Sequence, residues 1–438
     1  MAEDLIAAIR RAGVVGAGGA GFPSHVKMSA RAEYVIVNGA ECEPLIRVDQ
    51  QLLQSEARTV WAALKKLIKA TGAKRGIVAL KGKYRAAVDE LQRQKKPREC
   101  ELFILNDFYP AGDEHVLVHE VTGRTVPEAG IPLNVGCIVT NVETLINTAA
   151  ALEGRPVVDK YITVAGEVPQ PVTCSVPLGT SINEVLGMAG LKDVGGRVVI
   201  EGGPMMGRVV ENIARPVTKT TKGLIVLPEG HPLAVRKTRP EGRELKMSRT
   251  SCVQCYRCTE VCPRYLLGHR LQPHKVMRSL AYMLKDPGVV QSSLLCSECG
   301  ACEYACIMNL SPRRMNSEIK RQLAAAGVRF TAPLPESVPL GVRDHRKIPS
   351  KRLINFLGLG LYDVSAPLLE EGIIPRRVVL PLKQHTGLAS VPVVCEGQKV
   401  ARGELVADIP EDSLGACLHA SIDGTVTGVT ADQITIQA

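Results

Sequence analysis

The chain has 438 residues, of which 45% are hydrophobic and 22% are charged, a composition typical of a soluble globular protein with roughly two to four domains. It contains no stretch of about 20 uncharged apolar residues, so a membrane span is not expected. The formal charge of +10 is scattered and aromatic residues make up only 3%, which disfavours nucleic acid as a partner. The N-terminus lacks the apolar core of a signal peptide, so the predicted location is the cytoplasm or a compartment filled from it.

Residues 1–156 are predicted to alternate helices with strands. A short amphipathic helix over 2–12 leads into a glycine-rich turn at 16–23. Longer helical patterns cover about 49–71 and 83–94, and the β-branched runs that indicate buried strands are 34–38, 76–80, 102–105 and 137–141. This alternation predicts a Rossmann-like α/β domain with a mostly parallel sheet.

Three further domains are predicted after residue 156. Residues 157–235 are expected to form a small α+β module, with strands at 161–165, 197–201 and 223–227 around a short helix at 181–189. A basic, proline-bearing stretch over 228–247 is interpreted as a linker to a cysteine-rich domain, residues 245–330, which ends in a helix over 312–326. Short strands and glycine turns over 374–438 predict an all-β domain.

The cysteine-rich domain contains two copies of C-x2-C-x2-C-x3-C, the bacterial ferredoxin pattern for [4Fe–4S] clusters. The first copy is Cys252, Cys255, Cys258 and Cys262, and the second is Cys296, Cys299, Cys302 and Cys306. In two-cluster ferredoxins the fourth cysteine of each copy binds the other cluster. The pattern therefore assigns cluster one to Cys252, Cys255, Cys258 and Cys306, and cluster two to Cys262, Cys296, Cys299 and Cys302.

Zinc is the alternative occupant, because eight thiolates could also fill two four-ligand sites. Zinc ribbons use paired CxxC knuckles, whereas each copy here is a triple with a trailing fourth cysteine, so the ferredoxin interpretation is favoured. The other cysteines stand singly in the sequence and are expected to be small buried hydrophobic residues.

The glycine-rich segment from Gly16 to Pro23 contains a literal G-x-G-x-x-G. It follows a predicted helix rather than a strand, so the dinucleotide-binding context is missing and a structural turn is the alternative. Lys27 follows closely, and Asn38 ends the first predicted strand, at the edge where open α/β sheets bind ligands. Glycine amides and a lysine suit a mononucleotide phosphate, and Asn38 can hydrogen-bond the edge of a flavin ring.

Four motifs within residues 13–147 resemble those of one group of electron-transfer proteins. They are GAGGAGFPSHVK, VNGAECEP, YPAGDE at 109–114 and TNVETL at 140–145. Together they are similar to the flavin-binding subunit of respiratory complex I and to the RnfC family. The resemblance implies FMN, which accepts hydride from NADH and releases single electrons to iron–sulfur clusters.

The same resemblance implies a set of site residues. Those that would line the flavin are Gly18, Gly19, Gly21, Lys27, Asn38, Glu41, Asn141 and Thr144. Phe22 and Glu43 would lie on the NADH side and Glu114 near the junction of flavin and nicotinamide, which makes Glu43 and Glu114 the candidate catalytic residues. Cys42 stands where complex I has a serine, so the resemblance gives it no role.

The flanking domains extend the resemblance over nearly the whole chain. Residues 157–227 resemble a β-grasp module of the SLBB type, and residues 396–405 and 419–426 resemble a barrel-sandwich hybrid without its modified lysine. In RnfC the sandwich precedes the flavin domain, whereas here it comes last. That order, with the stretch CVQCYRCTEVCPRYLLGHRLQPHKVMRSLAY, resembles the PduS-type cobalamin reductases of propanediol-utilisation microcompartments.

This resemblance implies an NADH-dependent reductase that passes electrons through FMN and two [4Fe–4S] clusters to a corrinoid, in support of a B12-dependent diol dehydratase. The partners it implies are a corrinoid or a corrinoid-handling enzyme such as an adenosyltransferase, and shell or lumen proteins of a bacterial microcompartment in the cytoplasm. One alternative is a relay subunit between NADH and a ferredoxin, a flavodoxin or another microcompartment redox enzyme. The other is a scaffold in which the clusters are purely structural.

Overall fold

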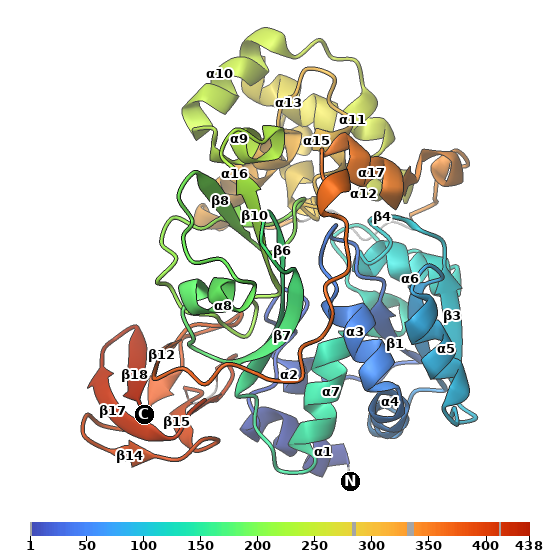
Figure 1. Cartoon of the computed structure of the whole chain (residues 1–438). Coiled ribbons are helices and arrows are strands. Elements are labelled where there is room, and N and C mark those ends of the chain that lie inside the picture. Colours follow the sequence, from blue (N-terminus) through green and yellow to red (C-terminus); the bar gives the residue numbers. More distant parts are fainter. Residues whose placement is uncertain (1, 283–285, 331–336, 411–412) are drawn as a thin grey trace.

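The computed structural model describes residues 2–282, 286–330, 337–410 and 413–438, and Figure 1 shows the arrangement of its sheets and helices. The N-terminal module is built on a four-stranded sheet in the order β3-β2-β1-β5. Its strands are β1 (Tyr34–Gly39), β2 (Arg75–Lys81), β3 (Cys100–Leu105) and β5 (Cys137–Asn141). All three neighbouring pairs are parallel, so the predicted parallel sheet is confirmed.

Helices cover both faces of this sheet. Val35 and Val37 of β1 share a core with α3, α4 and α7, whereas Ile36 points to the opposite core beside α6, because side chains alternate along a strand. The helices are α1 (Ala2–Arg11), α2 (Ser24–Met28), α3 (Val48–Ser55), α4 (Ala57–Thr71), α5 (Arg85–Arg93), α6 (Glu114–Thr122) and α7 (Val142–Ala151). Leu5 and Ile9 of α1 are buried in the first core, so the N-terminal helix is part of the fold.

The long helix predicted over 49–71 is in fact two helices. The helical backbone is interrupted at Glu56, which has φ −115° and ψ 23°. The break lets α3 pack against α5 while α4 packs against α7. Hydrophobic spacing alone did not reveal it, since both halves carry apolar residues on a helical period.

The second module is a five-stranded mixed sheet in the order β7-β6-β10-β8-β9. Its elements are β6 (Asp159–Gly166), β7 (Val172–Pro177), α8 (Ile182–Met188), β8 (Arg197–Glu201), β9 (Arg208–Val209) and β10 (Gly223–Pro228). The central pair β6 and β10 is parallel, and the other pairs are antiparallel. Helix α8 covers one face, whereas Ile200 and Ile225 on the other face join the core of the N-terminal module.

The stretch 228–247, predicted as a linker, is mostly helical and corrects that expectation. It contains α9 (Pro232–Thr238) and most of α10 (Glu241–Ser251). Pro232 lies in the first turn of α9, where its missing N–H removes no helical hydrogen bond. Leu233 and Ala234 are buried, so tertiary packing stabilises a helix that the composition did not suggest.

Short helices dominate the cysteine-rich domain at the top of Figure 1. They are α11 (Arg257–Glu260), α12 (Pro263–Leu266), α13 (Pro273–Tyr282), α14 (Pro287–Ser292), α15 (Ala301–Tyr304) and α16 (Pro312–Ala325). The chain then returns to the N-terminal module, where β11 (Ile348–Pro349) pairs with β4 (Phe108–Tyr109) and is followed by α17 (Ser350–Phe356). The following segment runs along the second module, where Leu369 donates its N–H to the carbonyl of Thr173 at 2.8 Å.

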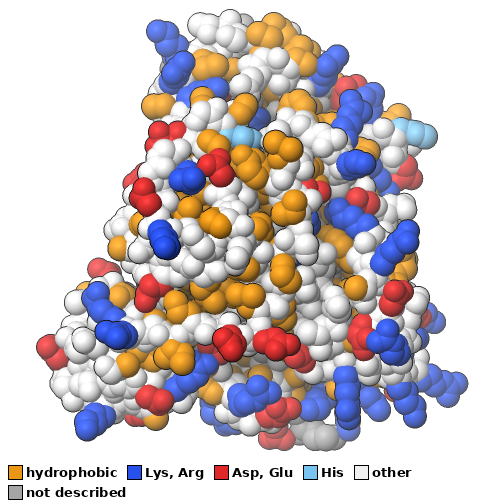
Figure 2. Space-filling view, in the orientation of Figure 1, with side chains coloured by type: hydrophobic (Ala, Val, Ile, Leu, Met, Phe, Trp, Pro, Cys, Tyr) orange, Lys and Arg blue, Asp and Glu red, His pale blue; other side chains and the backbone are white. Residues whose placement is uncertain are grey.

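The C-terminal domain, at the lower left of Figure 1, contains two small sheets in the orders β12-β18-β17-β14 and β13-β15-β16. The strands are β12 (Arg377–Pro381), β13 (Val391–Pro392), β14 (Lys399–Val400), β15 (Leu405–Asp408), β16 (Leu418–His419), β17 (Gly424–Val429) and β18 (Gln433–Gln437). Among the described residues, no helix is both long and apolar enough to cross a bilayer. Figure 2 shows lysine and arginine side chains spread over the visible face among acidic ones.

Candidate functional site

The glycine-rich loop meets the ends of two neighbouring strands at one edge of the first sheet. Ala17 donates its N–H to Thr144 Oγ1 at 2.9 Å, which ties the loop to the first turn of α7. A Cβ placed on Gly18 would lie 3.6 Å from the Cβ of Asn141. Asn141 begins α7, because its Oδ1 accepts the N–H of Glu143 at 3.0 Å. The structure therefore brings Gly18, Asn141 and Thr144 together, and their role in lining a flavin stays a prediction.

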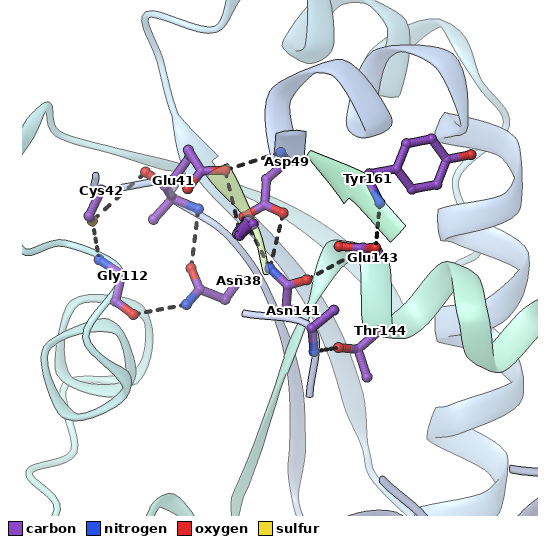
Figure 3. Close-up of polar contacts among 12 residues, drawn as sticks. Asn38, Glu41, Cys42, Asp49, Gly112, Asn141, Glu143, Thr144 and Tyr161 are labelled. Atoms are coloured by element: carbon purple, nitrogen blue, oxygen red, sulfur yellow. Dashed lines mark hydrogen bonds and ion pairs between the residues drawn. The ribbon is translucent and has the colours of Figure 1, made fainter. Parts of the chain in front are cut away.

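A buried polar network lies beside this loop (Figure 3). Both carboxylate oxygens of Asp49 accept hydrogen bonds from Asn141 Nδ2 at 3.0 Å, and Oδ2 pairs with Lys222 Nζ at 2.6 Å. Lys222 Nζ also lies 3.3 Å from Glu41 Oε2, which accepts the N–H of Asp49 at 3.2 Å. Sequence reasoning missed Asp49 and Lys222. Neither stands in a recognisable motif, and Lys222 comes from the second module.

Burial shifts the acid–base behaviour of this network. It raises the pKa of Glu41 to about 7, with a further rise from the Asp49 carboxylate and an opposing effect of the Lys222 ammonium. Although burial lowers the pKa of Lys222, the two carboxylates outweigh it and raise that pKa above its usual value. Lys222 is therefore a cation at neutral pH, while Glu41 is near the midpoint of its titration.

The contribution of Glu41 to the stability of the protein is expected to fall as the pH rises from 4.5 to about 7. In this window the unfolded chain releases the Glu41 proton, whereas the folded protein keeps it, so rising pH favours the unfolded state. Glu41→Gln stays neutral at every pH, so its stability relative to the wild type should rise across this window. Thermal midpoints of both proteins across this pH window check the prediction, and a variant that follows the wild-type curve would contradict it.

Lys27 and Glu114, predicted to meet the phosphate and the nicotinamide, contact each other. Lys27 Nζ lies 2.9 Å from Glu114 Oε1 and donates to the carbonyl of Val139 at 2.7 Å. Asp113 fixes the position of Glu114 at the start of α6 by accepting the N–H of His115. An ion pair this accessible to solvent contributes little stability, so Lys27 can exchange Glu114 for an anionic ligand at little cost.

Asn38 and Cys42 are both held by Gly112 (Figure 3). Asn38 Nδ2 donates to the carbonyl of Gly112 at 2.9 Å, and Asn38 Oδ1 accepts the N–H of Ala40 at 3.1 Å. Cys42 Sγ accepts the N–H of Gly112 at 2.7 Å. Burial raises the pKa of the Cys42 thiol, which keeps it neutral and unreactive. Cys42 therefore joins the loop after β1 to the loop before α6.

Glu43 is engaged by the second module. Its carboxylate accepts the N–H of Met205 at 2.8 Å and that of Met206 at 2.7 Å. The contact is close, since a Cβ on Gly203 would lie 2.1 Å from Glu43 Oε2. Burial raises the pKa of Glu43. Glu43 thus ties the two modules together, and its role toward NADH stays a prediction.

The end of the glycine loop rests on the C-terminal domain. Thr386 donates its N–H to the carbonyl of Gly21 and its hydroxyl to the carbonyl of Ala20, both at 3.0 Å. A Cβ on Gly21, whose φ is 63°, would meet Thr220 Cγ2 at 2.9 Å. At Gly19, by contrast, an added Cβ would meet no atom within 4 Å. The loop is therefore supported on one side and open at Gly19.

These residues fit FMN. Gly18 and Gly19 are exposed, so their backbone is accessible to a ligand, and half-buried Phe22 offers an aromatic surface in the same loop. Thr140 Oγ1, just before Asn141 at the end of β5, is buried without a hydrogen-bond partner in the described structure. An open glycine backbone, a displaceable lysine and an unpaired hydroxyl are the groups that a flavin mononucleotide can use.

The ligand cysteines form two groups in the structure. A cavity is lined by Cys252, Cys255, Cys258 and Cys306, which we call the outer group. The charges of Cys296 and Cys299 act on both Cys262 and Cys302, so these four also lie together, and we call them the inner group. The fourth cysteine of each copy joins the three of the other, as crossed ligation requires.

The two copies also share an unusual backbone. Gln254 and Tyr256 in the first copy have φ of 54° and 70°, and Glu298 and Gly300 at the matching positions have φ of 59° and 79°. Left-handed backbone is uncommon for residues other than glycine. Its repetition at the same two positions shows that both copies wrap their cysteines in the same way.

The chemistry of the cysteines fits iron–sulfur clusters. Burial raises the pKa of Cys258 and of Cys299 to about 12, with further rises from neighbouring thiolates at Cys258 and from Asp113 and Cys296 at Cys299. Bound cations are therefore needed to keep the sulfurs deprotonated at neutral pH. Within the described ranges, no three His, Cys, Asp or Glu side chains are arranged to hold a single metal ion. A cubane does not require that arrangement, because each thiolate binds a different iron.

The inner cysteine group contacts the N-terminal module directly. The hydroxyl of Tyr109, on β4, donates to the carbonyl of Cys299. Arg264, two residues after Cys262, pairs with Asp113 at 2.7 Å between Nη1 and Oδ1. Tyr109 and Asp113 stand in one of the motifs that suggested the resemblance, although no pattern in the sequence indicated this bridging position.

Three family models match the chain. The Nuo51 FMN-binding domain covers residues 9–150, the 4Fe-4S dicluster domain covers residues 251–311, and the RnfC barrel sandwich hybrid domain covers residues 365–438. These matches confirm the predictions of FMN, of [4Fe–4S] clusters and of a C-terminal barrel-sandwich fold.

Relatives with curated names match almost the whole length. Cobalamin reductase PduS of Salmonella typhimurium is 45% identical over 438 residues, which covers 99% of this chain and 96% of the relative. The chain belongs to the PduS family. PduS of Citrobacter freundii is 44% identical over the same shares of both chains. A component of the proton-translocating ferredoxin:NAD(+) oxidoreductase complex of Clostridium ljungdahlii is 30% identical, and the match covers 60% of this chain and 56% of that component.

Among solved structures, the NAD+-reducing [NiFe]-hydrogenase in the H2-reduced state resembles this PduS-family chain with a TM-score of 0.51 at 21% identity. The match covers 75% of this chain and 62% of the hydrogenase chain. At this level of identity the likeness shows a shared fold.

Proposed function

We propose that the chain is an NADH-dependent cobalamin reductase. Electrons pass from NADH through the flavin site and the two cysteine groups to the cobalt of a corrinoid. The observation that carries the proposal is the direct contact of Tyr109 and Asp113 with the cysteine-rich domain, which joins the flavin site and the cluster ligands in one unit. The names of the two PduS relatives, which match 99% of the chain, supply the acceptor.

The electron count sets the stoichiometry. NADH becomes NAD+ and a proton and gives up two electrons, and each cobalt gains one, so one NADH reduces two corrinoids by one step each. FMN, when bound, supplies the conversion between two-electron and one-electron chemistry. The chain holds the groups near one another and surrounds the inner cysteines with protein.

We assign the flavin-lining role to the residues that meet at the sheet edge. They are Gly18, Gly19, Gly21, Phe22, Lys27, Asn38, Glu41, Asn141 and Thr144. Lys27 supplies the cation for the phosphate, and Glu114, its ion-pair partner, is the carboxylate that would be released there. The metal ligands are the eight cysteines of the outer and inner groups.

We infer four domains, with the boundaries expected from the sequence: 1–156, 157–235, 245–330 and 374–438. The second is proposed to be a β-grasp domain. Its strand order, the parallel central pair and α8 across one face support that assignment.

We also propose that the protein works inside a bacterial microcompartment in the cytoplasm, with shell or lumen proteins and an adenosyltransferase as partners. This rests on the membership of the PduS family. Co-purification of the protein with intact microcompartments tests it.

A relay function is the second candidate. Three relatives are components of complexes whose names include ferredoxin:NAD(+) or ion-translocating oxidoreductase, and each is 30–31% identical over 60% of the chain. In this alternative the acceptor is a ferredoxin or a flavodoxin rather than a corrinoid.

One anaerobic experiment separates the candidates. The reconstituted holoprotein, with its flavin, iron and sulfide counted, receives NADH, and the absorption spectrum is followed with cob(II)alamin, ferredoxin or flavodoxin present. Fast cobalamin reduction supports the reductase, whereas a strong preference for a protein carrier supports the relay. If NADH bleaches neither the flavin nor the clusters, both proposals fail and a scaffold is left.

A further inference from the structure

The two cysteine groups differ in their exposure. In the inner group, Cys262 is 6% exposed, Cys299 and Cys302 are each 8% exposed, and only Cys296 is partly exposed. In the outer group, Cys255 is exposed and the other three are partly exposed. The outer group is therefore more accessible to solvent than the inner group, although the two cysteine motifs have the same spacing and the same backbone conformation.

The groups also differ in what surrounds them. Cys299 and its neighbour Ala301 belong to the same hydrophobic core as the N-terminal sheet, and Tyr109 bonds the carbonyl of Cys299. Cys252 and Cys306 pack instead in a small core whose described members all come from the cysteine-rich domain. The inner group thus lies against the flavin module, whereas the described core around Cys252 and Cys306 contains no residue of that module.

Apolar and basic side chains border the outer group. The cavity formed by its four cysteines is also lined by Val253 and Met308. Val253, Ile307 and Met308 are 58%, 54% and 38% exposed, so apolar side chains reach solvent beside the outer group. Arg257, between Cys255 and Cys258, is exposed as well.

We propose that electrons enter the cluster pair at the inner group and leave at the outer group, and that the corrinoid docks on the rim formed by Val253, Ile307, Met308 and Arg257. The rate of electron tunnelling falls steeply with distance. Entry is therefore fastest at the group in contact with the flavin module, and exit is fastest at the group that an acceptor can reach.

The rim chemistry matches a corrinoid. A corrinoid is a flat macrocycle whose ring face and methyl groups are apolar, its edge carries amide side chains, and its nucleotide loop carries a phosphate. The apolar side chains suit the ring, and Arg257 complements the phosphate. This inference rests on the proposed function, because it takes the acceptor from there.

Two cysteine variants test the order of transfer. Cys255→Ala removes an outer ligand and Cys299→Ala an inner one, and iron and sulfide counts on the anaerobic holoprotein establish that each variant has lost one cluster. With Cys255→Ala, NADH should still reduce the remaining inner cluster, followed by its spectrum, while cobalamin reduction drops by at least about tenfold. With Cys299→Ala, the remaining outer cluster should stay oxidised after NADH. The opposite pattern overturns the proposal.

A surface variant tests electron transfer out of the outer cluster without replacing a cysteine ligand. Ile307→Asp should keep wild-type iron, sulfide and flavin contents and wild-type reduction of both clusters by NADH, but reduce cob(II)alamin about tenfold more slowly. Ile374→Asp is the matched control, because Ile374 is an apolar residue that is 90% exposed in another domain. Equal cobalamin rates for the two variants overturn the docking rim.

The wild-type protein separates failure of this inference from failure of the proposed function. If NADH reduces its clusters but cobalamin is not reduced, the proposed acceptor and the docking rim are wrong. The order of the clusters is then still decided by the two cysteine variants, since their readout is the spectrum of the remaining cluster.

Discussion

Replacing Glu143 with alanine is expected to lower the free energy of unfolding by about 3–5 kcal/mol, because it leaves the ammonium of Lys160 buried without a counter-charge. The two side chains form an ion pair and are only 1% and 2% exposed. Glu143 also accepts the N–H of Tyr161 at 3.1 Å, so the start of β6 loses a second partner (Figure 3). Burial lowers the pKa of Lys160, and loss of Glu143 removes the main opposing effect.

The measurement is denaturant unfolding followed by the fluorescence of Trp61. This is the only tryptophan of the chain, and it is buried in the same module. The double variant Glu143→Leu/Lys160→Met removes both charges and should recover much of the loss. Glu153→Ala is the matched control, because both partners of the Glu153–Arg155 pair are exposed and such pairs contribute little to stability. Equal losses of unfolding free energy for the Glu143 and Glu153 variants would show that the buried ion pair contributes no more to stability than the exposed one.

Replacing Gly18 with leucine is expected to abolish flavin binding while the fold and the iron content are retained. A Cβ at this position lies in ordinary contact with Asn141 at 3.6 Å, and Gly18 does not require a left-handed backbone. The longer side chain therefore has room in the protein alone, but occupies the space over the exposed loop that we assign to FMN. The expected loss of flavin affinity is at least about a hundredfold, which corresponds to about 2.8 kcal/mol.

Gly187→Leu is the control for this substitution. Gly187 is an exposed glycine in α8, and an added Cβ there meets nothing within 4 Å. Both variants are compared for flavin bound after reconstitution, for iron and for the far-ultraviolet circular dichroism spectrum. A Gly18 variant that retains flavin as well as the Gly187 variant does would show that the glycine loop is only a turn.

The sequence predicted the parts of the site that are encoded locally. The cysteine groups follow from a fixed spacing over two short segments, and Gly18, Asn38 and Asn141 stand in motifs beside strand ends. Asp49 and Lys222 could not be found in this way, since their 2.6 Å contact joins residues 173 positions apart in two different modules. Asp49 lies in the first turn of α3, and an acidic residue in the first turn of a helix is too common in sequences to indicate a buried polar network.

The errors in the fold have a related cause. The two helices in 228–251 depend on contacts with distant segments, such as the packing of α10 against α13, rather than on strong local periodicity. The break at Glu56 is likewise set by the different neighbours of α3 and α4. The strands of the first sheet were predicted well because buried parallel strands are short apolar runs that need no partner to be recognised.

The hydrogen bonds between Thr386 and the glycine loop have a consequence for the order in which the protein folds during synthesis. The hydroxyl of Thr386 bonds the carbonyl of Ala20, a residue made 366 positions earlier by the ribosome. Lys219 adds a second tether, because its Nζ donates to the carbonyls of Gly13 and Cys417 at 2.7 Å. The glycine loop can therefore reach its final contacts only after translation has passed these late residues, and we expect flavin to bind after the C-terminal domain has been synthesised.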